Sequence, residues 1–330
     1  MMLRNYIPIG RRARVMVALL GTLLAAAFSY GQNSKPADKV IHIGYQKYGT
    51  LVLLKARGTL EKRLAASHVE VQWTEFPAGP QLLEGLNVGS IDFGIAGEAP
   101  PIFAQAAGAD IIYAGYEPQA SAGEALVVPK NSPIKSLSDL RGKKIALNKG
   151  SNVHYLLVKL LEKAGLKYSD IDAIYLPPAD ARAAFERGSV DAWVIWEPFL
   201  AAVQNQIGAR TLADGEGLVS NHQFFLASRT YAQKHPEVLS ATLEELAAVD
   251  KWAETNLSDA ATALQPQIGL DHTTLQLALS RGGYGVKPVT DAVMSEQQQI
   301  ADAFYNLRLI PKHINVRDAT LHDVQAQAGH

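Results

Sequence analysis

The feature that most constrains the fold of this chain is a short motif that occurs twice. Gly89-Ser90-Ile91-Asp92 returns in the second half of the chain as Gly188-Ser189-Val190-Asp191. Glu98 and Glu197 follow the two motifs at the same spacing, each just past an apolar strand. The repetition predicts that the chain builds a similar α/β unit twice. The alternative is chance similarity of common helix–Gly-Ser–strand punctuation, which leaves the matched Asp and Glu positions unexplained.

Each unit is expected to bring a strand, a turn and the start of a helix together. In the second unit, residues 144–147 predict a buried strand, Gly150-Ser151-Asn152 a turn, and helix-spaced apolar residues run on to the stop signal Gly165. Residues 46–50 are the corresponding turn of the first unit. Because free backbone N–H groups and the helix dipole attract anions, both turns are candidate anion sites. An ordinary capped helix is the alternative.

The two units and a helical C-terminal part predict an α/β chain of two lobes. Beyond residue 230 the apolar spacing becomes helical. Strands near residues 125–129 and 224–227 are expected to carry the chain between the lobes. We expect residues 38–126 and 224–330 to form lobe 1 and residues 127–223 to form lobe 2, each a mostly parallel sheet flanked by helices. A ligand cleft between the lobes would close by a hinge motion.

Residues 1–31 are expected to be a signal peptide and not part of the fold. Four arginines precede an apolar run over residues 15–28 that is too short to span a bilayer, and the small residues Ser29 and Gly31 follow it. We expect cleavage after one of these two residues and a mature protein in the periplasm, with an uncleaved anchor as the alternative. The chain has no cysteine, so neither a lipoprotein anchor nor a disulfide is expected.

The composition narrows the class of partner. The 330 residues are 48% hydrophobic and 19% charged, which are ordinary values for a globular protein. The formal net charge is −1, and loss of the leader arginines makes the remaining body more acidic. This balance argues against nucleic acid and against an anionic membrane surface as partners. Local dipoles, and not net charge, would have to hold an anionic ligand.

Motifs typical of catalysis and of metal binding do not occur in the sequence. G-x-S-x-G, H-E-x-x-H, a Walker loop and G-x-G-x-x-G are all missing, and the nine histidines never pair at metal-ligand spacing. We therefore expect no catalytic residue, no metal and no cofactor. Ser151 and His154 stand three residues apart at a helix start, and they leave a secreted hydrolase as an alternative of another class.

The predicted loops instead offer groups that suit ligand binding. Trp196 at a strand exit is expected to wall an apolar part of a ligand, whereas Trp193 either does the same or lies in the core. For Glu98 and Glu197 three roles remain open. They accept hydrogen bonds from the ligand, they hold the lobes together by capping backbone N–H groups, or they are solvated surface carboxylates. Arg281, in a glycine-rich turn, either reaches the cleft or ends a helix. Side-chain donors in the two turns are Gln46, Thr50, Ser151, Asn152 and His154.

Several stretches of the chain resemble the aliphatic sulfonate-binding proteins. The most specific is Pro177-Pro178-Ala179-Asp180-Ala181-Arg182-Ala183-Ala184-Phe185, which is typical of the sulfonate branch of that family. The similarity runs from about residue 40 to about residue 318. The other stretches are residues 43–47, 73–84, 89–94, 97–106, 149–157, 186–193 and 284–286.

The resemblance implies a type II periplasmic binding protein fold and a monomeric protein that delivers alkanesulfonates to an ABC importer for sulfur acquisition. The partners it implies are a small organosulfonate, the permease and its ATPase. We expect the sulfonate group near Thr50 and Ser151 and its tail toward Trp196 and Pro100. The ligand contacts that the resemblance implies are Gln46, Gly49, Thr50, Gly97, Glu98, Ser151, Asn152, His154, Trp196 and Glu197, to which the glycine-rich turn adds Arg281.

Two positions depart from the family pattern and leave the ligand open. Many members have Gly-Asn or Gly-Gly where Tyr48-Gly49 stands, and a second arginine where Gly282 stands. Relatives on the same fold bind taurine, nitrate or thiamine precursors, and these are the alternative ligands.

Overall fold

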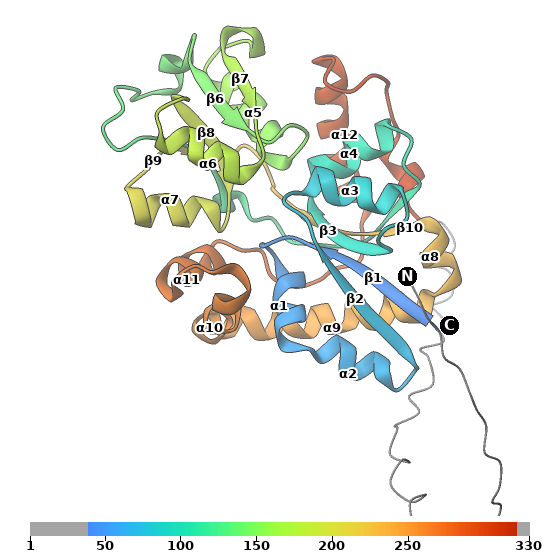
Figure 1. Cartoon of the computed structure of the whole chain (residues 1–330). Coiled ribbons are helices and arrows are strands. Elements are labelled where there is room, and N and C mark those ends of the chain that lie inside the picture. Colours follow the sequence, from blue (N-terminus) through green and yellow to red (C-terminus); the bar gives the residue numbers. More distant parts are fainter. Residues whose placement is uncertain (1–38, 322–330) are drawn as a thin grey trace, which may run out of the picture. The chain divides into compact units, whose positions relative to one another are not determined.

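The computed structural model describes residues 39–321, which contain two five-stranded sheets (Figure 1). The expected signal peptide, residues 1–31, lies outside the described residues. Both sheets belong to one compact unit of the chain. Four strands of each sheet run in one direction and a single strand runs the opposite way, because every antiparallel pair includes that one strand.

The first sheet combines strands from two distant parts of the sequence. Its order is β2-β1-β3-β10-β4, and β10 is the reversed strand between β3 and β4. Alternate residues of β3, β4 and β10 pack against helices on the two faces, so these strands are mostly apolar, whereas the edge strand β2 alternates apolar and polar residues. The strands are β1 (Lys39–Tyr45), β2 (Val69–Glu75), β3 (Phe93–Gly97), β4 (Ile111–Glu117) and β10 (Gln223–Ser228).

The second sheet is continuous in the sequence. Its order is β7-β6-β8-β5-β9, and the reversed strand β5 lies between β8 and β9. Residues of β5, β6 and β8 form the centre of its core together with the apolar face of the following helix. The strands are β5 (Glu124–Val128), β6 (Lys144–Leu147), β7 (Asp172–Tyr175), β8 (Ala192–Trp196) and β9 (Arg210–Asp214).

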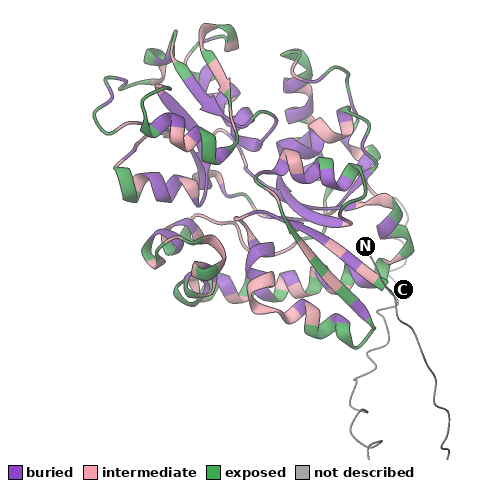
Figure 2. Cartoon of the chain, viewed as in Figure 1, coloured by how far each residue is buried: buried purple, intermediate pink, exposed green. Residues whose placement is uncertain are grey.

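Helices cover the two faces of the first sheet with separate apolar clusters (Figure 2). One face packs against α1 (Thr50–Arg57), α2 (Thr59–Ala65), α8 (Arg229–Lys234), α9 (Pro236–Thr255), α10 (Leu257–Ile268) and α11 (His272–Ser280). The other face packs against α3 (Gly79–Asn87), α4 (Ala99–Ala106) and α12 (Asp291–Asn306). The core of this sheet therefore has a layer of helices on each side.

The second sheet is flanked by α5 (Asn152–Lys163), α6 (Pro178–Glu186) and α7 (Phe199–Ile207). Trp193 is fully buried here and packs against Phe185, which settles its role in the core. Within residues 39–321 no helix is both long enough and apolar enough to cross a bilayer.

Most of the expected elements are present near their predicted positions, but two were not predicted. The helix α7 follows Pro198 directly, and the strand β9 is half-buried along its whole length. A strand that is half-buried at every position shows no alternation of apolar and polar residues, so period-two analysis does not detect it. The division at residues 126 and 223 remains a prediction.

Candidate ligand-binding site

A small pocket lies where loops from both sheets meet, and we call it the polar pocket. Its empty volume is about 260 Å³. The loop after β1, the last residues of β3 and β8 and the start of α5 contribute to it, which fits the rule that ligands bind at the carboxyl ends of parallel strands. Its lining residues are Gln46, Tyr48, Gly79, Gly97, Pro100, Ser151, Asn152, Trp196 and Gln223.

Gly97 and Asn152 lie in close contact at this pocket. A Cβ atom added at Gly97 would lie 2.7 Å from Asn152 Oδ1, which is closer than van der Waals contact allows. Glycine is therefore required at position 97 for the Asn152 side chain to sit at the end of β3. The last residue of β3 thus lets the first residue of α5, a helix that flanks the second sheet, approach the first sheet closely.

Asn152 is the centre of a buried hydrogen-bond network. Its Nδ2 donates to Glu124 Oε2 at 2.6 Å and to Asn221 Oδ1 at 2.7 Å, and Gln223 Nε2 donates to the same Asn221 oxygen at 3.3 Å. Burial raises the pKa of Glu124 well above its usual value, and its Oε1 has no partner within residues 39–321. Burial therefore favours the protonated form of Glu124, whose carboxyl group holds the amide of Asn152 in place.

Gln223 reaches the pocket through the pairing of β10. Its backbone pairs with Gly97 on one side and with Glu117 on the other, because β10 lies between β3 and β4. On the other side of the pocket, Gln46 Nε2 donates to the carbonyl oxygen of Ile95 at 3.0 Å, which fixes the plane of its amide. The side-chain amides of Gln46 and Gln223 thus both lie at strand ends of the first sheet.

Ser151 precedes the first residue of α5, but its hydroxyl does not cap the helix. The Ser151 Oγ donates to the carbonyl oxygen of Asn148 at 2.7 Å, and no side chain caps the helix start. The free end of this helix therefore faces the polar pocket with its backbone N–H groups and the positive end of its dipole. The alternative of an ordinary side-chain cap at this position is wrong.

His154 is held one turn further along α5 and does not line the polar pocket. Its Nδ1 accepts a hydrogen bond from the Gly150 N–H at 3.2 Å, and its Nε2 lies 2.9 Å from the Tyr168 hydroxyl. The ring also stacks on Phe103. Burial lowers the pKa of His154 to about 4, so the imidazole is neutral at pH 7.

The two repeated glutamates are buried, and each accepts a hydrogen bond from a backbone N–H group. Glu98 Oε2 accepts from the His222 N–H at 3.1 Å, and its Oε1 has no partner among the described residues. Glu197 Oε2 accepts from the Ala201 N–H at 2.9 Å, and its Oε1 pairs with Arg281 at 2.5 Å. Burial raises the pKa of Glu98 to about 8 and also raises that of Glu197. Both carboxyl groups are thus engaged with groups of the protein itself.

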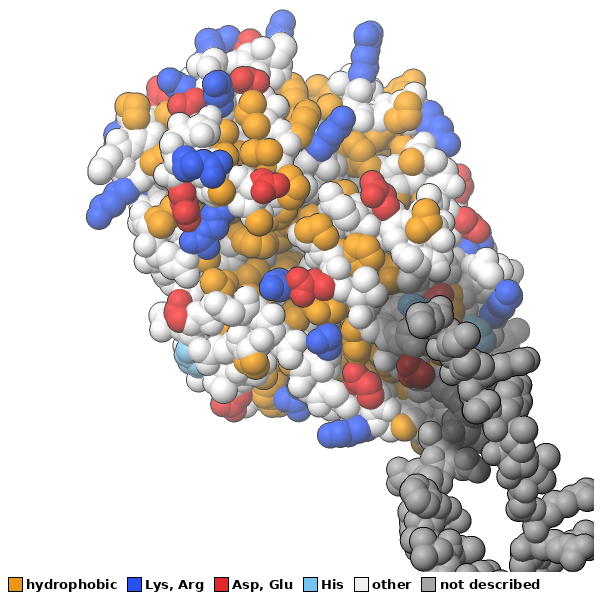
Figure 3. Space-filling model, viewed as in Figure 1, with side chains coloured by type: hydrophobic (Ala, Val, Ile, Leu, Met, Phe, Trp, Pro, Cys, Tyr) orange, Lys and Arg blue, Asp and Glu red, His pale blue; other side chains and the backbone are white. Residues whose placement is uncertain are grey.

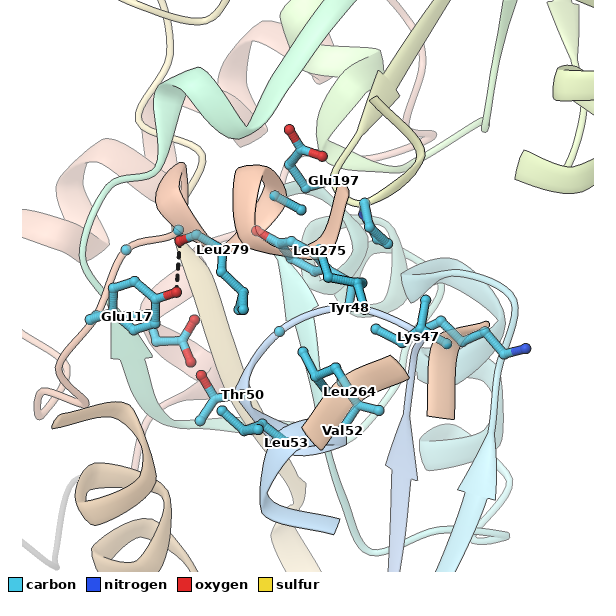
Figure 4. A pocket seen from close by; sticks show the side chains of 17 residues that line it. Lys47, Tyr48, Thr50, Val52, Leu53, Glu117, Glu197, Leu264, Leu275 and Leu279 are labelled. Carbon is cyan, nitrogen blue, oxygen red and sulfur yellow. Dashed lines mark hydrogen bonds between the residues drawn. The ribbon is translucent and has the colours of Figure 1, made fainter. Parts of the chain in front are cut away.

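Gly49 and Thr50 lie at a second, larger cavity, which we call the apolar cavity (Figure 4). Its empty volume is about 560 Å³, and Leu53, Leu264 and Leu275 from three helices line it. The Thr50 hydroxyl donates to Asp250 Oδ1 at 2.5 Å and is buried. The start of α1 therefore lies beside a different cavity from the start of α5.

The structure thus divides the predicted site residues into three groups. Tyr48, Gly79 and Gln223 also line the polar pocket but were not predicted as contacts; for Gln223 the only signal was a polar residue directly before an apolar strand. His154, Glu98 and Arg281 line neither cavity. Gln46, Gly97, Ser151, Asn152 and Trp196 line the polar pocket, and Gly49, Thr50 and Glu197 line the apolar cavity.

Comparison with known proteins identifies the family of this chain. The model of the NMT1-like family matches residues 34–265. A relative from Escherichia coli K12, whose name describes an aliphatic sulfonates-binding protein, is 44% identical over 92% of this chain and 94% of its own length. The chain belongs to the NMT1-like family and to the aliphatic sulfonate-binding proteins. The expected family resemblance is therefore confirmed.

Two solved structures of this family share the fold. The alkanesulfonate-binding protein SsuA from Xanthomonas axonopodis pv. citri, bound to MOPS, is 43% identical and has a TM-score of 0.83, covering 87% of this chain and 98% of that chain. The periplasmic aliphatic sulphonate binding protein SsuA from Escherichia coli is 44% identical with a TM-score of 0.78, covering 86% and 92%. The predicted α/β fold with two sheets flanked by helices is thus confirmed.

Proposed function

We propose that this chain captures an aliphatic sulfonate in the polar pocket and delivers it to an ABC importer. The observation that carries the proposal is the neutral lining of the pocket: amides, a hydroxyl and a helix start converge there, and no Lys or Arg is among the lining residues that the structure describes. A sulfonate carries one charge at every relevant pH and accepts hydrogen bonds on three oxygens. Fixed dipoles are sufficient to hold such a group.

The buried carboxyl groups near the pocket are compatible with an anionic ligand as well as with a cationic one. Glu124 and Glu98 would repel a sulfonate if they were ionised, but burial raises the pKa of both. Each carboxyl group also accepts a hydrogen bond from the protein, Glu124 from Asn152 and Glu98 from His222. Both carboxyl groups act as positioning groups behind the residues that face the ligand.

We further propose a binding protein and not a hydrolase. A Ser–His catalytic pair needs the serine hydroxyl within hydrogen-bond reach of a ring nitrogen. The Ser151 hydroxyl donates to Asn148, and the ring nitrogens of His154 face Gly150 and Tyr168. This geometry favours the reading in which Ser151 serves the ligand and His154 supports the turn before α5.

The proposed cellular setting follows from the leader and from the named relatives. Residues 1–31 are proposed to direct export to the periplasm and to be removed there, and a permease with its ATPase is the proposed partner. The mass of the exported protein tests the leader, because cleavage after Ser29 or Gly31 gives a defined N-terminus.

We propose a monomer, with residues 38–126 and 224–330 as lobe 1 and residues 127–223 as lobe 2. Figure 3 shows Lys, Arg, Asp and Glu interspersed on the face in view.

Thermal unfolding of the ligand-stripped mature protein tests the proposal. Alkanesulfonates, taurine, sulfate and nitrate are compared at equal concentration. A ligand at about 100 times its dissociation constant stabilises the folded state by about 2.7 kcal/mol, which gives a clear shift of the melting temperature. Stabilisation by organosulfonates but not by sulfate or nitrate is the expected result. If no sulfonate stabilises the protein, the substrate assignment is wrong.

Two substitutions test the placement of the sulfonate. Asn152→Ala and Ser151→Ala each remove a polar group from the pocket and are expected to weaken sulfonate binding by about tenfold. Asn205→Ala is the control, because Asn205 donates to Thr274 and lines neither cavity. Affinity is measured by calorimetry, and the unfolding of each ligand-free variant is recorded so that lost binding is separated from lost folding. Unchanged affinity when Ser151→Ala and Asn152→Ala are combined in one protein would show that the ligand lies elsewhere.

A further inference from the structure

Asn221 lines neither cavity, but it touches both segments that connect the two sheets. Residues 118–123 lead from β4 to β5, and residues 215–222 lead from β9 back to β10. Asn221 belongs to the second segment, is fully buried, and donates through Nδ2 to the carbonyl oxygen of Ala120 in the first segment at 2.9 Å. Its φ of 51° lies in the left-handed region, which asparagine adopts more readily than other non-glycine residues.

The carbonyl oxygen of Ala120 decides the orientation of the Asn221 amide. A carbonyl oxygen only accepts hydrogen bonds, so the amide nitrogen of Asn221 has to face Ala120 and its oxygen has to face the other way. On that other side Asn221 Oδ1 accepts from Asn152 Nδ2 at 2.7 Å. The amide of Asn152 is thereby oriented as well, and its second N–H donates to Glu124 Oε2 at 2.6 Å. One backbone carbonyl thus sets two side-chain amides in series.

Both N–H groups of the Asn152 amide are consequently used within the protein, and its oxygen is left for a ligand. No hydrogen bond of Asn152 Oδ1 is found within residues 39–321. This oxygen lies against Gly97, and both residues line the polar pocket. Asn152 is only 7% exposed, and a buried acceptor without a partner marks a point where a donor from a ligand or a water belongs.

Other side chains of the polar pocket show the same polarity. Gln46 Nε2 donates to a backbone carbonyl oxygen and Gln223 Nε2 donates to Asn221 Oδ1, so each amide keeps a single N–H for other partners. Ser151 donates its only hydroxyl hydrogen to a backbone carbonyl oxygen. The side chains therefore offer mainly acceptors, whereas the backbone N–H groups at the start of α5 are donors. The pocket thus has two chemically different parts.

We propose that Asn221 is a positioning residue of the ligand site and that, through Asn152, it makes the polar pocket selective for sulfonates with a hydrogen-bond donor close to the sulfonate group. The sulfonate group faces the backbone N–H groups at the start of α5, and the donor, a hydroxyl or an ammonium group, faces Asn152 Oδ1. This inference rests on the proposed sulfonate function. It adds the class of substrate, a short hydroxy- or aminoalkanesulfonate, and a residue that selects it without touching it.

Calorimetry with a matched pair of ligands tests the selectivity on the ligand-stripped mature protein. Hydroxyethanesulfonate and propanesulfonate have equal numbers of non-hydrogen atoms and differ only in a terminal hydroxyl group against a methyl group. A buried acceptor that the ligand leaves unpaired is costly, so hydroxyethanesulfonate is expected to bind about tenfold more tightly than propanesulfonate. Equal affinity of the two ligands, or tighter binding of propanesulfonate, would overturn the selectivity.

Asn221→Gly tests the positioning role. Glycine adopts a positive φ without strain, so the backbone of the segment is kept, while Asn152 loses the acceptor that orients its amide. The preference for hydroxyethanesulfonate is expected to fall from about tenfold to about twofold or less, because the freed amide can turn an N–H toward the pocket. Asn221→Ser is the second variant in case Asn221→Gly does not fold, since its shorter side chain cannot reach Ala120 and Asn152 together.

His68→Gly is the matched control. His68 also has a positive φ, of 53°, but it is exposed and lines neither cavity. Its replacement is expected to leave the preference at about tenfold. Urea unfolding of each ligand-free variant is recorded so that a loss of folding is separated from a loss of selectivity.

The outcomes separate this inference from the proposed function. A preference that is lost in Asn221→Gly and kept in His68→Gly supports the positioning role. If Asn221→Gly weakens both ligands equally, or leaves the preference unchanged, the role of Asn221 is wrong and the sulfonate function stands. If neither ligand binds the wild type although other alkanesulfonates stabilise it, the inference fails alone. If no organosulfonate binds, both fail.

Discussion

Glu98 provides a direct test of the electrostatic reasoning. Its side chain is 1% exposed, one oxygen accepts the His222 N–H, and the other has no partner within residues 39–321. Burial raises its pKa from 4.5 to about 8. In the unfolded chain this carboxyl group loses its proton near its ordinary pKa, whereas in the folded protein it keeps the proton up to about pH 8.

The sign of the pH dependence follows from this difference. Above pH 4.5 the folded state binds more protons than the unfolded state, so the free energy of unfolding falls as the pH rises, until the folded group also ionises near pH 8. One pKa unit corresponds to about 1.4 kcal/mol, so the contribution at pH 7 is a loss of about 3 kcal/mol relative to acid pH. Glu98→Gln cannot ionise and removes this loss.

Urea unfolding of the ligand-free protein from pH 4 to pH 8 measures the effect. The free energy of unfolding of Glu98→Gln, minus that of the wild type, is expected to rise by about 3 kcal/mol between pH 4.5 and pH 7. Glu254→Gln, at an exposed position, should follow the wild-type curve. A flat difference curve would mean that Glu98 is ionised at pH 7, and the explanation of how an anion tolerates this carboxyl group would then be wrong.

Two further predictions concern buried side chains near the two helix starts. Thr50→Val removes the hydroxyl that donates to Asp250 and leaves a buried carboxyl group without this donor, so a loss of about 1–3 kcal/mol of unfolding free energy is expected in urea, with the exposed Thr262→Val as control. The lowered pKa of His154, about 4 against 6.5, contributes stability that is present above pH 6.5 and is lost as the pH falls toward 4. In an NMR titration its ring should therefore not titrate above pH 5, and titration near pH 6.5 would contradict its burial.

The sequence was sufficient for the repeated α/β units because their signals are local. The strand β6, the turn at Gly150 and the end of α5 before Gly165 were predicted at nearly their observed positions. Each depends on apolar spacing and on glycines with positive φ, which are properties of neighbouring residues. The family resemblance added the type of fold and the class of ligand.

The membership of the two cavities could not be predicted in the same way. Gln223 lies in the polar pocket only because β10 pairs with both β3 and β4, and no local pattern predicts which strands a distant segment will join. For the same reason the starts of α1 and α5, which look equivalent in sequence, face different cavities. The conformation of a turn is local, but what it faces depends on long-range packing.

The position of β10 also sets an order in which the chain can be completed. All strands of the second sheet lie between Glu124 and Asp214, so this sheet can be assembled as soon as that segment is available. The first sheet has to keep a place open between β3 and β4 until Gln223–Ser228 arrives, after the whole second sheet has been made. The strands β3 and β4 emerge early but gain β10 as a neighbour only at the end, and during that interval their edges remain open to pairing with other chains.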